Sequence, residues 1–239
     1  RTLAYSRCQG FSSWKLAAMS LPTDTAAAAE FLELLDPNAA EFCFRTFDDK
    51  NNNSQLAKNF NGPLEDSLSG LSAKHNSGAG VFVVINEGGH KDEDITRIRY
   101  VFADTDGAPL CPLTAALEPH MVIESSLEKY HVYWRVSDCL STDFKTIQRA
   151  IATKFCTDKV ISNTSRVMRL PGYFHQKATP FQVRLITSKP DLATYTLAEI
   201  IDGLGLNISP HQTVTPQTSL AAQAVESIHE PRTASLHDM

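Results

Sequence analysis

The chain has 239 residues, 42% of them hydrophobic, and a formal net charge of −5. That length is enough for one sizeable hydrophobic core, or for one core with a small appendage. The apolar stretches, such as residues 81–85, are far shorter than the roughly 20 residues of a membrane-spanning helix, so we expect a soluble protein. The five cysteines are widely spaced and form no CxxC pair, which disfavours a zinc site or a disulfide framework and fits a reducing cytoplasm.

The predicted elements of the first half begin with a helix over residues 25–35. Four consecutive alanines favour helix there, and Asp24 is placed to cap the first turn. A strand is predicted over residues 41–47, followed by a polar turn and a short helix over residues 64–75. The apolar run of residues 80–86 predicts a second strand.

The second half alternates further strands with helices. A strand over residues 97–103 leads directly into Asp104-Thr105-Asp106-Gly107. The remaining predicted elements are paired strands over 121–124 and 130–136, a helix over 142–155, strands over 160–170 and 181–187, and a short helix over 197–204. The whole pattern predicts an α+β fold with an antiparallel sheet.

The two ends of the chain differ in composition from the middle. Residues 1–18 precede Met19 and lack the apolar region of a secretory signal, so we expect an upstream segment, or one added for expression, that takes no part in the fold. Residues 207–239 are rich in Ser, Thr, Gln, His and Pro, which is typical of a flexible tail or linker. One domain over residues 19–206 is expected between them.

Charge is distributed unevenly along the sequence. Residues 21–66 contain nine acidic and three basic residues, whereas residues 145–190 contain nine basic residues and the single acid Asp158. This asymmetry indicates a face that meets phosphate groups, with a solvated basic face that has no partner as the alternative.

Asp104 and Asp106 are the first candidates for chemistry because they directly follow an apolar strand. Side chains two residues apart in an extended chain point to the same side, and two such carboxylates repel unless a cation lies between them. Mg²⁺ or Mn²⁺ is the cation that suits carboxylate oxygens. Taken alone, the motif is better interpreted as an ordinary Asp-Gly turn that closes a strand.

A DxDG motif after an apolar strand is also the first motif of the haloacid-dehalogenase phosphatases. That interpretation requires a lysine and then an acidic pair downstream. Here the adjacent pair Asp48-Asp49 lies upstream, and no GDxxxD follows Lys177. The phosphatase interpretation therefore ranks second.

His131 lies on an aromatic strand, where it shares one face with Tyr133, while Tyr130, Val132 and Trp134 form the face expected in the core. An imidazole that faces a ligand can donate a hydrogen bond to a phosphate oxygen, with a purely structural histidine as the alternative. A rolling-circle nicking site needs a His-x-His pair and is disfavoured, because Tyr133 stands at the position of the second histidine.

Residues 158–177 carry the other candidates. Arg166, Arg169 and Lys177 surround a Leu-Pro-Gly bend, and arginine forks bind phosphates in a bidentate way. The odd spacing of Arg166 and Arg169 predicts that they point to opposite faces of a regular strand, so at least one would serve the structure or a template. Asp158 is a candidate third metal ligand, with a surface acid after a helix as the alternative.

Together these segments resemble the archaeo-eukaryotic primase superfamily, in particular the RepB-like primases of plasmids and phages. The resemblance rests on the apolar-DxD block of residues 101–106, the His-containing block of residues 125–134, and the block from Asp158 through Arg-Val-Met-Arg-Leu-Pro-Gly to Lys177. The stretch over residues 76–86 also fits that branch.

The resemblance implies an RRM-like sheet with flanking helices that forms a primase-polymerase catalytic core. The implied site residues are Asp104, Asp106 and Asp158 for a divalent metal, and His131, Arg166, Arg169 and Lys177 for the incoming nucleotide. The implied activity is Mg²⁺- or Mn²⁺-dependent primer synthesis from NTPs or dNTPs on single-stranded DNA, in the replication of a phage, prophage or plasmid, with a replicative helicase as a further partner. An inactive nucleic-acid-binding protein of the same fold is the alternative.

Two positions depart from the family pattern. Asn163 stands where relatives often carry a second acid before Ser-Arg, which leaves Asp158 as the third ligand. Leu127-Glu128 replaces the usual small turn and predicts an altered mouth of the site.

Overall fold

The computed structural model describes residues 21–208, so the expected upstream segment 1–18 and nearly all of the expected tail 207–239 lie outside the described residues. Along the chain the elements are α1 (Thr25–Leu35), β1 (Phe42–Asp48), the 3₁₀ turn η1 (Ser54–Leu56), β2 (Lys58–Gly62), α2 (Leu64–Asn76), β3 (Ala79–Val84), β4 (Glu87–Gly88), η2 (Asp92–Asp94), β5 (Ile95–Arg97), β6 (Tyr100–Asp104), α3 (Cys111–Ala116), β7 (Met121–Ser126), β8 (Lys129–Arg135), α4 (Ser141–Phe155), β9 (Val167–Arg169), β10 (Phe174–His175), β11 (Phe181–Gln182), β12 (Arg184–Ser188) and α5 (Leu197–Gly203). Within this described part, no helix is both long and apolar enough to cross a membrane.

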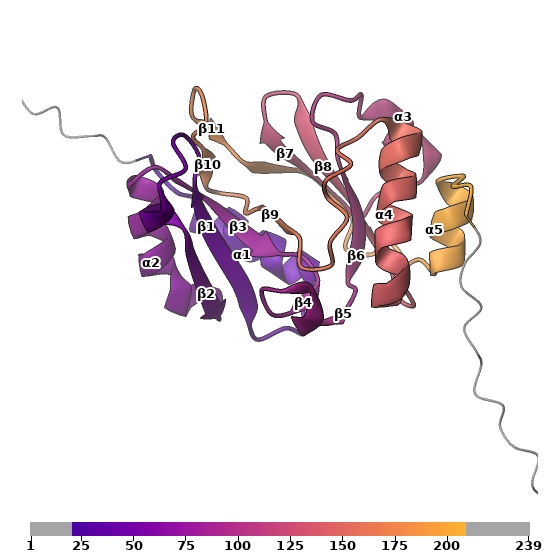
Figure 1. Cartoon of the computed structure of the whole chain (residues 1–239), viewed down its shortest axis with the longest axis horizontal. Coiled ribbons are helices and arrows are strands. Elements are labelled where there is room, and N and C mark those ends of the chain that lie inside the picture. Colours follow the sequence, from indigo (N-terminus) through magenta and orange to yellow (C-terminus); the bar gives the residue numbers. More distant parts are fainter. Residues whose placement is uncertain (1–20, 209–239) are drawn as a thin grey trace, which may run out of the picture.

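Two antiparallel four-stranded sheets form the framework, in the strand orders β2-β1-β3-β9 and β12-β7-β8-β6. Helix α2 packs on β1, β2 and β3, and helix α4 packs on β6. Figure 1 shows these two helices at opposite sides of the molecule, with the sheets and the connection through β9 and β10 between them. The expected α+β fold is confirmed, with two principal antiparallel sheets in place of one.

Helix α1 is held by its apolar face more than by its alanine run. Asp24 caps the helix as predicted, because its side chain accepts a hydrogen bond from the backbone N–H of Ala27 at 3.0 Å. Phe31 is fully buried, and its ring lies edge-on to that of Tyr133 in β8, with the ring centroids 6.1 Å apart. Burying one such side chain contributes about 1.5–3 kcal/mol, whereas helix propensities differ by less than about 1 kcal/mol per residue among ordinary residues.

The bend at Pro171-Gly172, which lies between Arg169 and Lys177, is hydrogen-bonded to the start of α1. Gly172 has a φ of 86°, a conformation that residues with side chains rarely adopt. Its carbonyl accepts a hydrogen bond from the backbone N–H of Asp24 at 2.9 Å, and a Cβ on Gly172 would collide with the carbonyl oxygen of Asp24. The bend therefore requires glycine, and it fixes where β9 ends and β10 begins.

One buried side chain, Asn86, accounts for two differences from the predicted strands. The strand expected over residues 97–103 is split into β5 and β6, because Asn86 Oδ1 accepts the backbone N–H of Arg99 at 3.1 Å. The strand expected over residues 160–170 forms only as β9, and Asn86 Nδ2 donates to the carbonyl of Thr164 at 2.9 Å in the loop before it. Strand β2 and helix α3 have no predicted counterpart, because β2 is largely polar and α3 has only six residues.

Both faces of β8 are covered, which corrects the expectation that only one of them lies in the core. Tyr133 is fully buried, and His131 on the same face is 4% exposed. The ring of Tyr133 packs against Phe102 of β6 as well as against Phe31 of α1. A ligand that contacts His131 must therefore reach a side chain that is almost entirely buried.

The buried side chain of His120 is expected to make the stability of the fold depend on pH. Its ring is buried, Nδ1 accepts the backbone N–H of Arg135 at 3.0 Å, and Nε2 lies 3.2 Å from the carbonyl oxygen of Ala193. Burial, together with the charge of Arg135, lowers the pKa of His120 to about 4. In the unfolded chain a histidine binds a proton near pH 6.5, whereas His120 in the folded chain does so only near pH 4. The contribution of His120 to the free energy of unfolding is therefore complete above about pH 6.5, and it is lost as the pH falls toward about 4.

We expect this group alone to lower the free energy of unfolding by on the order of 3 kcal/mol across that window. Urea unfolding measured between pH 7 and pH 4 checks the expectation. The variant His120→Asn should show a shallower pH dependence, because asparagine does not titrate there. An equally steep dependence in the variant would assign the effect to other groups.

Candidate active site

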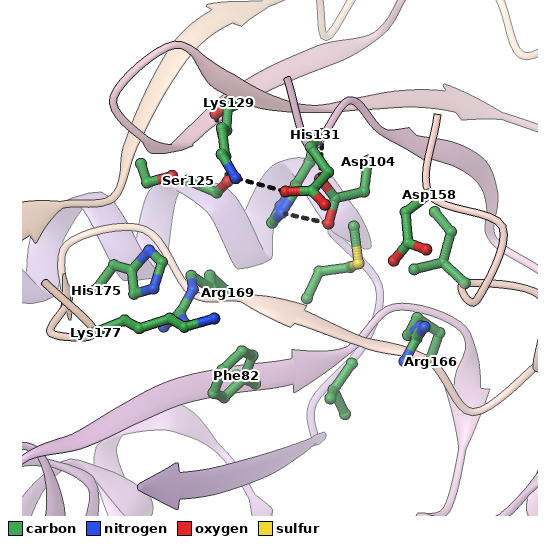
Figure 2. A pocket seen from close by; sticks show the side chains of 15 residues that line it. Phe82, Asp104, Ser125, Lys129, His131, Asp158, Arg166, Arg169, His175 and Lys177 are labelled. Atoms are coloured by element: carbon green, nitrogen blue, oxygen red, sulfur yellow. Dashed lines mark hydrogen bonds and ion pairs between the residues drawn. The ribbon is translucent and has the colours of Figure 1, made fainter. Parts of the chain in front are cut away.

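One pocket of about 300 Å³ opens beside the end of β6. All seven residues that the sequence singled out line it: Asp104, Asp106, His131, Asp158, Arg166, Arg169 and Lys177. Figure 2 shows Asp104, His131 and Asp158 along one side of the space, with Arg169 and Lys177 facing them from the other. The fold thus brings acidic and basic groups from distant parts of the sequence to one cavity.

The two aspartates reach the pocket by different routes. Asp104 is the last residue of β6 and lies directly opposite His131 of β8. Asp106 lies beyond the strand, in a turn where its φ is 39° and that of Gly107 is 100°. The backbone N–H of Asp106 donates to Asp104 Oδ1 at 3.2 Å. A tight turn, and not the strand alternation assumed from the sequence, therefore places both carboxylates at one pocket.

The carboxylate of Asp106 is paired with Lys129 from the start of β8. Lys129 Nζ lies 2.6 Å from Asp106 Oδ1, and this hydrogen bond and charge raise the pKa of Lys129. The two side chains are 45% and 64% exposed, and exposed pairs of this kind contribute only about 0–1 kcal/mol. The pair neutralises Asp106 but is weak enough to open.

Asp104 and Asp106 fit a hard divalent cation by their chemistry, since both offer carboxylate oxygens. Among residues 21–208 no group of three or more His, Cys, Asp or Glu side chains is arranged to hold a metal ion. Asp158 lines the same pocket, but its carboxylate accepts the backbone N–H of Val160 at 2.8 Å, and Figure 2 shows it on the side of Arg166. Two carboxylates are nevertheless enough for the common arrangement in which substrate phosphates and waters complete the shell of Mg²⁺.

His131 forms part of the deep wall of this pocket. Its Nε2 lies 3.7 Å from Asp104 Oδ2, and its Nδ1 lies 3.4 Å from the hydroxyl oxygen of Tyr133. Burial lowers the pKa of His131, and the charge of Asp104 only partly opposes that shift. The ring is therefore neutral at pH 7, with one N–H to donate and one nitrogen to accept.

Arg166 and Arg169 both line the pocket, contrary to the expectation from their odd spacing. Arg166 precedes β9, which begins at Val167, so strand alternation does not govern its direction. Burial lowers the pKa of Arg166, and its Nε has no hydrogen-bond partner in the described part of the chain. Arg169, by contrast, donates two hydrogen bonds to Asp49, at 2.8 and 3.2 Å. Only one of the two guanidinium groups is thus already bound by a carboxylate.

Several lining residues were not singled out from the sequence, and His175 is the main one. Its Nε2 is buried and has no hydrogen-bond partner within residues 21–208. Burial and the charge of Arg169 lower the pKa of His175. The i, i+2 spacing of His175 and Lys177 was the available signal, since both side chains of such a pair reach one side of an extended segment. Phe82 also lines the pocket, with the guanidinium carbon of Arg169 4.7 Å from its ring centroid.

Asn163 and the pair Asp48-Asp49, which the sequence analysis also considered, make their contacts outside the pocket. Asn163 does not line it, because its amide reaches Ser165 Oγ at 3.2 Å and Asp92 Oδ1 at 3.4 Å. Asp48 accepts backbone N–H groups in its own loop, and Asp49 holds Arg169. The pair Asp48-Asp49 therefore supplies no free carboxylates, and the phosphatase interpretation finds no support in this antiparallel fold.

Comparisons with known proteins agree with this fold. Residues 96–203 match the family model of the RepB DNA-primase N-terminal domain. No curated protein sequence matches the chain. The structure is similar to the AEP domain of the primase-polymerase of cyanophage S-2L, with a TM-score of 0.64 and 20% identity over 77% of this chain and 100% of that chain.

Two further solved structures share the fold. The primase RepB′ matches with a TM-score of 0.59 and 19% identity, over 74% of this chain and 61% of that chain. The catalytic domain of RepB′ in complex with initiator DNA matches with the same TM-score and identity, over 74% of this chain and 92% of that chain. At such low identity these likenesses establish the fold, while the family match spans the segment that carries all seven lining residues predicted from the sequence.

Proposed function

The chain belongs to the RepB-like branch of the primase-polymerases, and from that premise we propose that it is a metal-dependent nucleotidyltransferase that synthesises primers on single-stranded DNA. The observation that carries the proposal is the convergence, in one pocket, of two carboxylates at a strand end with the cationic Arg166, Arg169 and Lys177. Joining a 3′-hydroxyl to a nucleoside triphosphate needs both kinds of group, because charge builds up on the attacking oxygen and on the leaving pyrophosphate.

Asp104 and Asp106 would hold Mg²⁺ or Mn²⁺ in this function, with Asp158 as the third candidate ligand. When bound, the cation would stabilise negative charge on the attacking oxygen and on the transferred phosphoryl group. Lys129, which neutralises Asp106 in this structure, would then be free to contact a phosphate oxygen.

The chain's own residues position the triphosphate on the opposite side of the pocket. Arg166, Arg169 and Lys177 supply positive charge where the phosphates would lie. His131 is neutral and buried, so it would donate a hydrogen bond to a phosphate oxygen rather than act as a second cation.

The biological setting is also part of the proposal. The proposed setting is the replication of a phage, prophage or plasmid, with single-stranded DNA as the partner. The similarity to a phage primase-polymerase and to the primase RepB′ with initiator DNA supports a role in replication and a DNA partner. NTPs or dNTPs would be the substrates. A replicative helicase as a further partner, and a location in the cytoplasm of the bacterium or infected host, complete the proposal.

A second candidate function is an inactive replication protein of the same fold that binds nucleic acid. The Lys129–Asp106 ion pair favours it, because the ammonium group 2.6 Å from Asp106 Oδ1 offsets the charge of that carboxylate. Metal-dependent product formation separates the two functions.

We expect the purified chain to extend or initiate short oligonucleotides on single-stranded DNA when Mn²⁺ or Mg²⁺ and nucleoside triphosphates are present. Labelled products resolved on a denaturing gel, with a chelator as the control, provide the measurement. A retarded DNA band without any product, in either metal and with either NTPs or dNTPs, would favour the inactive binding protein and overturn the enzymatic proposal.

A further inference from the structure

We propose that Asp49, which does not line the pocket, is a positioning residue for its phosphate-binding side; this inference rests on the proposed function. The side chain of Asp49 is 4% exposed and lies in the loop after β1. Its Oδ1 accepts Arg169 Nη2 at 2.8 Å and its Oδ2 accepts Arg169 Nη1 at 3.2 Å, a two-point fork that fixes the plane of the guanidinium group. Oδ2 also accepts the backbone N–H of Gln176 at 2.8 Å. One carboxylate therefore holds both Arg169 and the chain between His175 and Lys177.

Gly80 of β3 provides the space for this ion pair. A Cβ on Gly80 would lie 2.7 Å from Arg169 Nη1 and 2.7 Å from Asp49 Oδ1, closer than real Cβ contacts. Gly80 is not among the residues with a positive φ, so its backbone conformation does not itself require glycine. Glycine at position 80 thus leaves the room that the Asp49–Arg169 ion pair occupies.

The segment that carries His175 and Lys177 is otherwise held by neutral hydrogen bonds. Gln176 Nε2 donates to the carbonyl oxygens of His75 at 2.9 Å and Ala79 at 3.2 Å. Asp49 is therefore the charged anchor of this segment. Because the ion pair is largely buried, removing either partner leaves the other as an uncompensated charge.

The expected consequence is a loss of preorganisation. Arg169 is stacked on Phe82 and forked to Asp49, so it is already oriented before any phosphate arrives. Without Asp49 the triphosphate would have to order Arg169, His175 and Lys177 on binding, and that ordering weakens affinity. The chemical step depends on the carboxylates across the pocket and should change much less.

The test compares Asp49→Asn and Gly80→Ala with the control Asp48→Asn. Asp48 is the neighbouring acid, and its carboxylate accepts only N–H groups of its own loop. We expect the KM for the nucleotide in primer synthesis, and the dissociation constant of ATP with Mn²⁺ by calorimetry, to rise about 10- to 100-fold in both test variants. We expect kcat to change less than about threefold, and the control to match the parent chain.

A double variant adds a readout that a merely structural role would not give. Asp49→Asn combined with Arg169→Lys should bind ATP little more weakly than Arg169→Lys alone, because coupled residues are not additive. Parent-like KM and ATP affinity in Asp49→Asn and Gly80→Ala, with an active parent chain, would overturn the positioning role alone. A parent chain that neither binds ATP nor makes product would overturn the proposed function with it. If Asp49→Asn fails to fold, Gly80→Ala, which keeps both charges, decides the question by the same criteria.

Discussion

Replacing Asp104 with asparagine (Asp104→Asn) should lower metal-dependent primer synthesis by about 10³-fold or more, the loss expected when a metal ligand worth several kcal/mol is removed. Asparagine has nearly the same shape, and its amide oxygen can still accept the backbone N–H of Asp106, as Asp104 Oδ1 does at 3.2 Å. What disappears is the negative charge at the end of β6. The measurement is the initial rate of product formation over a range of Mn²⁺ concentrations.

The matched control for this variant is Asp191→Asn, which removes an exposed acid that does not line the pocket. Both variants should melt at the temperature of the parent chain and bind single-stranded DNA alike. Retention of more than about a tenth of the activity in Asp104→Asn would rule out Asp104 as a metal ligand. Equal losses in both variants would point to a general effect of charge.

The parts of the fold that the sequence predicted are those set by local patterns. Helix α1 begins after its Asp24 cap, as expected, and β6 ends at Asp104, one residue beyond its predicted end. Spacing along the chain also placed His131 on a strand, and the fold then set it opposite Asp104. Apolar periodicity and turn chemistry act within a few residues, so they can be recognised without knowing the tertiary structure.

The parts that were missed depend on buried polar side chains that act over long distances in the sequence. Asp49 and Arg169 are separated by 120 positions, and neither periodicity nor composition marks their contact. Asn86 interrupts one predicted strand and fixes the loop before another in the same way. Such hydrogen bonds are specific to one tertiary arrangement and leave no repeating signal in the chain.

Only some basic residues of the stretch 145–190 line the pocket, and a count of charges does not tell which ones. The stretch contributes Arg166, Arg169 and Lys177 to one pocket, and that these side chains meet phosphates stays a prediction. Other members of the stretch have structural partners instead, since Arg184 pairs with Glu124 at 2.7 Å and the ammonium group of Lys154 donates to a backbone carbonyl at 2.8 Å. The sum of charges therefore located a segment but not the individual groups that line the pocket.

The distinction between the two pocket arginines leads to the other large expected effect. Arg169 is already forked to Asp49, whereas Arg166 Nε is buried without a partner in the described part of the chain. A phosphate oxygen would supply the missing acceptor, and hydrogen bonds between charged groups contribute about 1.5–3 kcal/mol. We therefore expect Arg166→Met, which keeps the apolar stem, to raise the KM for the nucleotide by roughly 10- to 150-fold.

Steady-state kinetics over a range of nucleotide concentrations would measure this change, with Arg149→Gln, an exposed arginine of α4, as the control. Arg166→Lys should recover only part of the affinity, because an ammonium group lacks the guanidinium's planar fork. If Arg166→Met kept the KM of the parent chain but lost affinity for single-stranded DNA, Arg166 would belong to the template side. The sequence left that choice open. Arg166 lines the pocket and its buried Nε has no partner among the described residues, which is the physical reason to expect the nucleotide instead.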